Sequence, residues 1–208
     1  HDPARGLPRR ETEGLGVSHM TPHAITVGPG RWLDITNPDP KMISVDDIAL
    51  LVSRRARFMG ATRAYYSGAQ HAWNVAMHLR AFGADPVVQW QGLMHDAHEA
   101  YMGDVATPHK DLYHGFRELE ELLQGAIFAR FDLPHPLDSK VKAVDELMLH
   151  SEAEVLLPQP VPSWVKPGLG VSAFCDLSPW AQVKACHKFL DLFYSLAKEV
   201  HREDPRRA

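Results

Sequence analysis

Apolar residues recur at helical spacing along most of the chain, which predicts a protein built mainly of α-helices. Serine, aspartate, glycine and proline punctuate this pattern where helices tend to begin or end. Ser44-x-x-Asp47 and Ser67-x-x-Gln70, for example, are capping-box-like starts. The signals together predict helices over residues 44–58, 67–82, 85–103, 115–131, 138–157 and 178–201. We therefore expect an all-α, single-domain helical bundle.

The first forty residues lack this pattern. Residues 1–19 are rich in charge, glycine and proline, and Ser18-His19-Met20 reads like a cloning junction. We therefore expect residues 1–19 to be a vector-derived or disordered segment, and residues 20–208 to form the domain. The proline-rich sequence of residues 20–40 predicts irregular structure with one short strand at Trp32–Ile35.

Composition narrows the class of protein. A chain of 208 residues with 45% hydrophobic and 23% charged side chains is typical of one globular domain. The net charge of −4 disfavours stable nucleic-acid binding, and no apolar run approaches the roughly 18 residues of a membrane span. Cys175 and Cys186 match no zinc or redox spacing, so we interpret them as thiols in a reducing cytosol. A cytoplasmic protein without a membrane segment is the expectation.

Two imidazoles and two carboxylates stand where they can converge on one ion. His71 falls in the first turn of the helix predicted over 67–82, and His95-Asp96 lies in the next helix. Asp145 shares a face of its helix with apolar residues, where an ionised carboxylate is costly unless it is paired or bound to metal. Mixed nitrogen and oxygen donors suit a divalent transition ion that keeps open positions for water and substrate. These residues therefore predict a metal site.

The neighbours of His95-Asp96 add acid–base and cationic groups. On a continuous helix Glu99 lies about 40° from His95, in the arc between His95 and Asp96, so its carboxylate is free to act on a bound water. Asp104 opens the following loop, where it could deliver a proton or, alternatively, cap the helix end. Arg57 and Lys110 are candidate phosphate clamps, with a solvated surface role as the alternative. The combination points to a metal-dependent hydrolase of a phosphate ester.

Most of the 13 histidines are expected to be packing or surface residues. His98 falls outside the arc of the predicted ligands, and a packing role is expected for it. His78 shares the face of His71 but lies about 10 Å further along the helix, too far to share one metal. Glu152 follows Asp145 by two turns and is expected to form a salt bridge.

The order His71, His95-Asp96, Asp145 resembles the H…HD…D signature of the HD-domain superfamily of metal-dependent phosphohydrolases. The string HDAHEAYMGDVATPHK is similar to the HD-x-x-E-x-x-x-GD-x-x-x-P-x-K pattern of one branch, which contains bacterial deoxynucleoside 5′-monophosphatases and small phage dATP triphosphohydrolases. The likeness runs from about residue 43 to 155. Gln70 and Phe58 depart from the branch, which often has glutamate and tryptophan there, and these departures bear on base and phosphate-number preference.

The resemblance implies roles for the matching residues. His71, His95, Asp96 and Asp145 would hold one divalent transition ion, which could be Co²⁺, Zn²⁺ or Mn²⁺. Mg²⁺ would accompany the phosphates of the substrate. Glu99 and Asp104 would be catalytic. The expected substrate contacts are Arg57, Phe58, Arg63 and Lys110, with Arg63 as an additional phosphate cation. The expected partner is a small-molecule deoxynucleotide, and the expected assembly is a homo-oligomer.

A dATP triphosphohydrolase that releases deoxynucleoside and triphosphate is the leading expectation, and a deoxynucleoside 5′-monophosphatase is the alternative. A di-iron HD oxygenase is more remote, because it needs two further histidines, for which His109 and His114 are the candidates. A non-catalytic nucleotide sensor is disfavoured by the presence of both Glu99 and Asp104.

Overall fold

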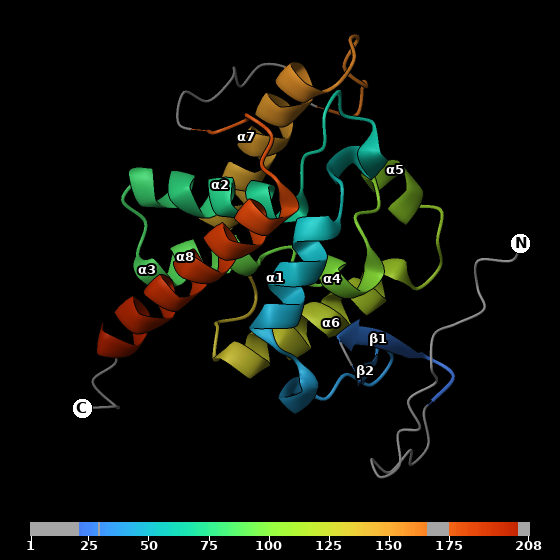
Figure 1. Ribbon diagram of the computed structural model, residues 1–208, viewed down its shortest axis with the longest axis vertical. Helices are drawn as coiled ribbons and strands as arrows, with labels where there is room; N and C mark the ends of the chain where they lie inside the picture. The colour runs from blue at the N-terminus through green and yellow to red at the C-terminus, as the bar shows by residue number, and fades with distance from the viewer. Residues whose placement is uncertain (1–20, 29, 166–174, 204–208) are drawn as a thin grey trace, which may run out of the picture.

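Helices make up most of the computed structural model, which describes residues 21–28, 30–165 and 175–203 (Figure 1). The helices are α1 (Val45–Arg54), α2 (Gly68–Ala81), α3 (Pro86–Met94), α4 (Glu99–Met102), α5 (Thr107–Lys110), α6 (Phe116–Phe131), α7 (Ser139–Leu156) and α8 (Gln182–Glu203). Shorter elements are the strands β1 (Ala24–Gly28) and β2 (Arg31–Asp34) and the 3₁₀ turns η1 (Pro40–Met42) and η2 (Arg57–Gly60). The predicted single-domain helical fold is confirmed, and the predicted segment 1–19 lies outside the described residues.

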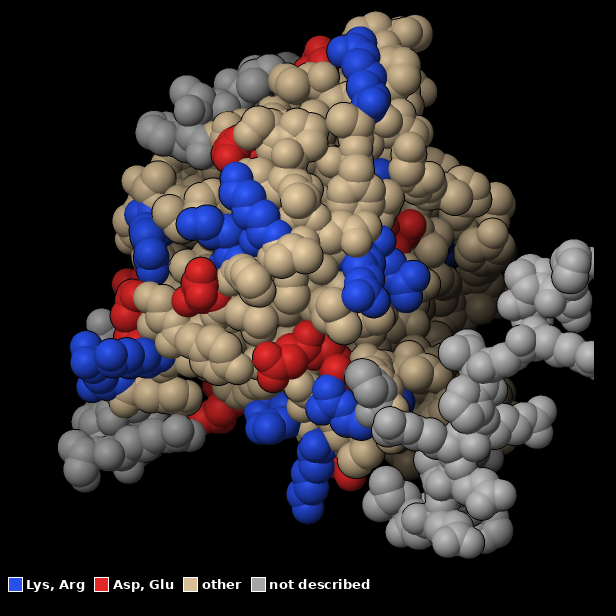
Figure 2. Space-filling view, in the orientation of Figure 1, with Lys and Arg blue, Asp and Glu red and all other residues tan. Residues whose placement is uncertain are grey.

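The bundle is built around α2, which packs against α1, α3, α7 and α8. The helix α8 crosses one side of the molecule diagonally, over α1, α2 and α3 (Figure 1). Its buried residues recur at helical spacing and join the main apolar core, namely Ala185, Phe189, Leu192, Phe193 and Leu196. On the face that carries α1 and α8, side chains of both charge signs are interspersed (Figure 2).

Three long helices begin where local signals predict. The Ser67 hydroxyl caps α2 by accepting a hydrogen bond from the Gln70 amide at 3.2 Å. The Asp138 carboxylate caps α7 in the same way, through the Lys140 amide at 2.8 Å. Gly115 precedes α6 with a φ of 76°, a backbone conformation that favours glycine.

The expected start of the first helix is confirmed, but its expected capping bond and its expected end were wrong. Ser44 precedes α1, but its side chain makes no capping bond. Its predicted capping partner, Asp47, instead forms a partly buried salt bridge with Arg31, which ties the β-hairpin to α1. The helix predicted to reach residue 58 ends at Arg54, and Phe58 has a φ of 54° that no α-helix permits.

The helix predicted over 85–103 is interrupted at the candidate ligands. It divides into α3 and α4, and residues 95–98 between them form turns. Hydrogen bonds there span three residues, from the Ala97 amide to the Met94 carbonyl (3.1 Å) and from the Glu99 amide to the Asp96 carbonyl (3.0 Å). Such bonds wind the chain more tightly than an α-helix, so the angle calculated for Glu99 on a continuous helix does not apply.

Smaller differences concern the connections. The hairpin has two antiparallel strands, of which only β2 was predicted. The one-turn helix α5 forms inside the segment expected to be a loop, and α8 begins at Gln182 rather than near residue 178. None of the described helices is both long and apolar enough to cross a lipid bilayer.

Candidate metal centre

The four predicted ligands come together from three parts of the fold. His71 lies on α2, His95 and Asp96 lie in the turns after α3, and Asp145 lies on α7. One donor atom from each residue falls within 4.8 Å of the others, so the group could hold a metal ion. His71 Nε2 is 3.3 Å from His95 Nε2 and 3.0 Å from Asp145 Oδ1, and His95 Nε2 is 3.0 Å from Asp96 Oδ2.

Hydrogen bonds on the far side of each imidazole determine which nitrogen faces this point. His95 Nδ1 lies 2.8 Å from the Gly92 carbonyl, and His71 Nδ1 lies 2.8 Å from Glu152 Oε1. Both oxygens accept, so each Nδ1 carries a proton and each Nε2 faces the centre of the group, where it offers a lone pair once it is deprotonated. Two lone pairs and two carboxylates directed at one point repel one another unless a cation lies between them. The donor set therefore fits a divalent metal ion.

The pKa shifts of the four residues also indicate a site that attracts positive charge. Burial lowers the pKa of His95, but Asp96 and Asp145 outweigh it and raise this pKa well above its usual range. Burial raises the pKa of Asp145, yet hydrogen bonds from His71 and His95 bring it well below its usual range. The cluster thus attracts positive charge strongly, and protons and a metal ion would compete for it.

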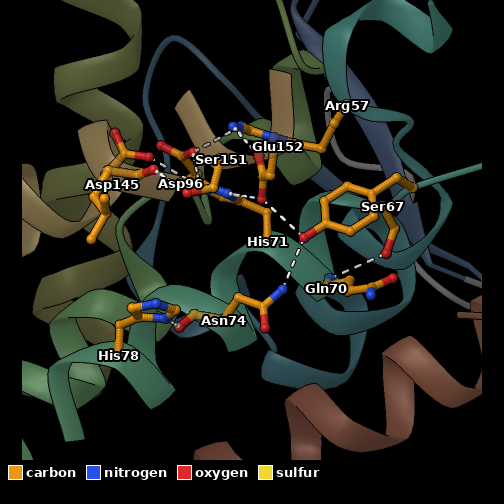
Figure 3. Close-up of polar contacts among 12 residues, drawn as sticks. Arg57, Ser67, Gln70, His71, Asn74, His78, Asp96, Asp145, Ser151 and Glu152 are labelled. Carbon is orange, nitrogen blue, oxygen red and sulfur yellow. Dashed lines mark hydrogen bonds and ion pairs between the residues drawn. The ribbon is translucent and has the colours of Figure 1, made fainter. Parts of the chain in front are cut away.

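Glu152 supports His71 from behind (Figure 3). Its carboxylate is completely buried on α7 and accepts hydrogen bonds from Tyr66 Oη at 2.9 Å and from Arg57 Nη2 at 3.2 Å, besides its contact with His71. Burial raises the pKa of Glu152, but His71 and Arg57 lower it overall. The predicted salt bridge is confirmed, whereas the contact with His71 was not predicted. A carboxylate behind a ligand histidine is a common support for a metal site.

Gly92 places His95. A Cβ atom at residue 92 would lie 2.3 Å from Leu79 Cδ1, so any larger residue there would require the Leu79 side chain to move where α3 approaches α2. The Gly92 carbonyl also orients the His95 ring. The close packing of two helices therefore determines where a candidate ligand lies.

The carboxylate donors Asp96 and Asp145 open onto a cavity of about 130 Å³. Its charged lining consists of Arg57, Asp96, Glu99, Asp104, Lys110 and Asp145, and its other lining residues include Phe58, Leu149 and Trp164. The Asp145 side chain is 36% exposed, so the expectation that it lies within the buried apolar stripe was wrong. Its neighbours Val141 and Met148 are buried, while Asp145 faces the cavity.

Both predicted acid–base residues line the cavity. Burial raises the pKa of Glu99, and the nearby Asp96 and Asp104 carboxylates raise it further, well above its usual range. Asp104 Oδ2 is buried and has no hydrogen-bond partner within the described part of the chain. A buried oxygen of this kind is available to a ligand or a water molecule.

Two of the three predicted phosphate cations line the cavity, and both already have anionic partners. Arg57 Nη1 is 3.6 Å from Asp96 Oδ2, and its guanidinium lies 5.6 Å from the centre of the Phe58 ring. Lys110 Nζ donates to Glu120 Oε1 at 2.6 Å. Arg63 is exposed and does not line the cavity, so the structure does not bring it to the site.

The other histidines take the structural roles expected of them. His98 lies 2.9 Å from Gln124 Oε1 and 3.2 Å from Glu120 Oε1, and His78 Nδ1 donates to the Asn74 carbonyl at 2.9 Å. Neither belongs to the candidate ligand group. His109 and His114 are exposed and also lie outside it, so no second metal group forms from them in the described chain. Three residues of the site were not predicted from the sequence. Tyr66 binds Glu152, Glu120 binds Lys110, and Trp164 lines the cavity.

Comparison with known proteins places the chain in a family. Uncharacterized protein YfdR of Escherichia coli K12 is 31% identical over 172 residues, which cover 82% of this chain and 93% of that protein. The chain belongs to the YfdR family. Uncharacterized protein RCAP_rcc00048 of Rhodobacter capsulatus is 34% identical over 134 residues, or 60% of this chain and 68% of that protein. No protein-family model matches this YfdR-family chain.

Proposed function

We propose that this protein is a metal-dependent phosphohydrolase of the HD-domain superfamily that acts on deoxynucleotides. One observation carries the proposal. Two imidazole Nε2 atoms and two carboxylates converge at the wall of a cavity that also presents Glu99, Asp104 and two cations. A donor group of this kind, open to a cavity, is what a catalytic metal needs, because substrate and water must reach the ion.

His71, His95, Asp96 and Asp145 would hold one divalent transition ion of the Co²⁺, Zn²⁺ or Mn²⁺ type. When bound, such an ion supplies Lewis acidity toward a phosphoryl oxygen and lowers the pKa of water. Glu99 and Asp104 stand in the same cavity and are the groups that would take a proton from the attacking water or give one to the leaving oxygen. Arg57 and Lys110 would offset the phosphate charge.

The charges that line the cavity bear on how many phosphate groups the substrate carries. Four carboxylates and two cations line it, a formal charge of −2 that one divalent ion would cancel. The triphosphate of dATP needs further cations for its β and γ groups, and Arg63, the candidate expected from the sequence, does not line the cavity. We therefore favour a deoxynucleoside 5′-monophosphate as substrate, with dATP triphosphohydrolysis as the second candidate.

A substrate panel tests the proposal. The metal-free protein is incubated with each dNMP, dNTP and NTP in the presence of Co²⁺, Mn²⁺, Zn²⁺ or Mg²⁺, and the products are separated by ion-exchange chromatography. Metal-dependent release of orthophosphate from dNMPs is the expected result. Release of intact triphosphate from dATP would favour the second candidate. Failure to hydrolyse any of these compounds with any of the metals would refute the proposed function.

A further inference from the structure

The wall of the cavity that contains Phe58, Leu149 and Trp164 plays no part in the proposed chemistry. Phe58 and Leu149 have no polar group, and Trp164 has only a neutral indole N–H, so none of the three carries charge toward a phosphate or transfers a proton. A site for a small phosphate ester would need only its charged lining, so an apolar wall beside that lining indicates a substrate with an apolar portion.

The helix α7 relates this wall to the candidate ligands. Leu149 follows Asp145 by one helical turn, which places the two side chains on one face about 6 Å apart along the axis. Trp164 belongs to the segment that follows α7 and lines the same cavity. A nucleotide whose phosphate lies beside Asp145 would therefore extend its sugar and base toward Leu149 and Trp164.

Trp164 is anchored by its neighbours while its own ring stays open. Val165 is only 4% exposed and packs with Ala153 and Leu157, and Phe58 packs against the same cluster. The Val165 amide also donates to the Pro162 carbonyl at 3.0 Å, which closes a turn around Trp164. Trp164 as a whole is 37% exposed and lines the cavity. A fixed backbone with an accessible aromatic face is suited to stacking on a ligand, because little side-chain freedom is then lost on binding.

We infer that Trp164 is the residue on which the nucleobase stacks, an inference that rests on the proposed function. Stacking on an indole tolerates any base, because every base presents a π-face. It distinguishes a nucleotide from a phosphorylated sugar that lacks a base. Loss of one base–aromatic stack weakens binding by about 5- to 150-fold.

The test compares two ligands that differ only in the base, dAMP and 2-deoxyribose 5-phosphate. Their affinities for the Zn²⁺-loaded protein are measured by calorimetry for wild type, Trp164→Ala and Trp164→Phe. We expect Trp164→Ala to weaken dAMP binding by about 5- to 150-fold and to leave the sugar phosphate unchanged, while Trp164→Phe retains most of the affinity. Trp32→Ala is the matched control, since Trp32 is 43% exposed and lies on β2, outside the cavity lining.

Equal losses for both ligands would overturn the inference, because they would show that Trp164 supports the site in general. Unchanged dAMP binding would overturn it as well. If Trp164→Ala does not fold, Trp164→Leu replaces it, since leucine keeps apolar bulk without an aromatic face. Binding of deoxyadenosine, which has no phosphate to hydrolyse, gives a readout independent of turnover. An inactive wild-type protein would thus refute the proposed function and still leave the role of Trp164 decided by binding.

Discussion

Replacing Glu152 by glutamine should weaken both metal binding and the fold, by different mechanisms. The Glu152 carboxylate accepts hydrogen bonds from His71, Tyr66 and Arg57 and has no solvent exposure. Glutamine has nearly the same shape but only one acceptor oxygen and no charge. If that oxygen serves His71 and Tyr66, the amide NH₂ must face Arg57, where two donors oppose each other.

The magnitude for metal binding follows from the contact with His71. Loss of the Glu152 charge makes Nε2 of His71 less basic. The imidazole ring is then also held less firmly in the orientation that directs Nε2 at the metal. Removal of such a support typically costs 10- to 100-fold in metal affinity, or about 1.4–2.7 kcal/mol. The magnitude for stability follows from Arg57, which is 7% exposed and would lose its nearest anion. Breaking a buried pair costs about 3–5 kcal/mol, and the more distant Asp96, 3.6 Å from Arg57, should keep the loss near the lower value.

Two assays separate these effects. Competition with a chromophoric chelator measures Zn²⁺ affinity at neutral pH, and urea denaturation of the metal-free protein measures the free energy of unfolding. Glu154→Gln is the matched control, because Glu154 lies two residues further on the same helix but is exposed. A folded Glu152→Gln variant that binds Zn²⁺ as tightly as wild type and Glu154→Gln would refute the reasoning about His71.

Three further changes test the rest of the site. Asp145→Asn should abolish stabilisation by Zn²⁺, which for the wild type should be about 2.7 kcal/mol at 100 times Kd; a variant whose Tm still rises with Zn²⁺ would exclude Asp145 as a ligand. Glu99→Gln should keep the metal and lose about 10²- to 10⁴-fold in kcat, so near-native turnover, or loss of metal, would contradict an acid–base role. Glu120→Gln should raise KM for a phosphorylated substrate by releasing Lys110, and should add nothing in a Lys110→Ala background. An additive effect in that double variant, or the same effect from the exposed neighbour Glu121→Gln, would argue against positioning through Lys110.

The helices that sequence analysis predicted correctly are those whose ends depend on local bonds. Ser67 and Asp138 cap α2 and α7 through amides two or three residues away, and Gly115 begins α6 by its own backbone conformation. The start of α1 after Ser44 was predicted correctly but its capping box was not, because Asp47 is bound by Arg31, sixteen residues earlier, rather than by the helix end. No local pattern contains that information.

The same distinction applies to the site. The ligand residues could be predicted because their types and order are characteristic of a metal site. Glu152 was expected only to form a salt bridge, since its contact with His71 joins residues 81 positions apart. Trp164 was not predicted at all, because nothing in the local sequence indicates that the segment after α7 lines a cavity formed with residues of η2 and α5.

The interruption of the helix at His95-Asp96 is the most informative failure. The apolar pattern of residues 85–103 continues at helical spacing, and over a single turn a 3₁₀ segment and an α-helix bury nearly the same face. They differ in where they place residues three apart, which are offset on an α-helix and eclipsed on a 3₁₀ turn. Asp96 and Glu99 are three residues apart, and the Glu99 amide donates to the Asp96 carbonyl. Both carboxylates therefore line the cavity, and Asp96 raises the pKa of Glu99. The interruption therefore aligns a candidate ligand with a candidate acid–base group.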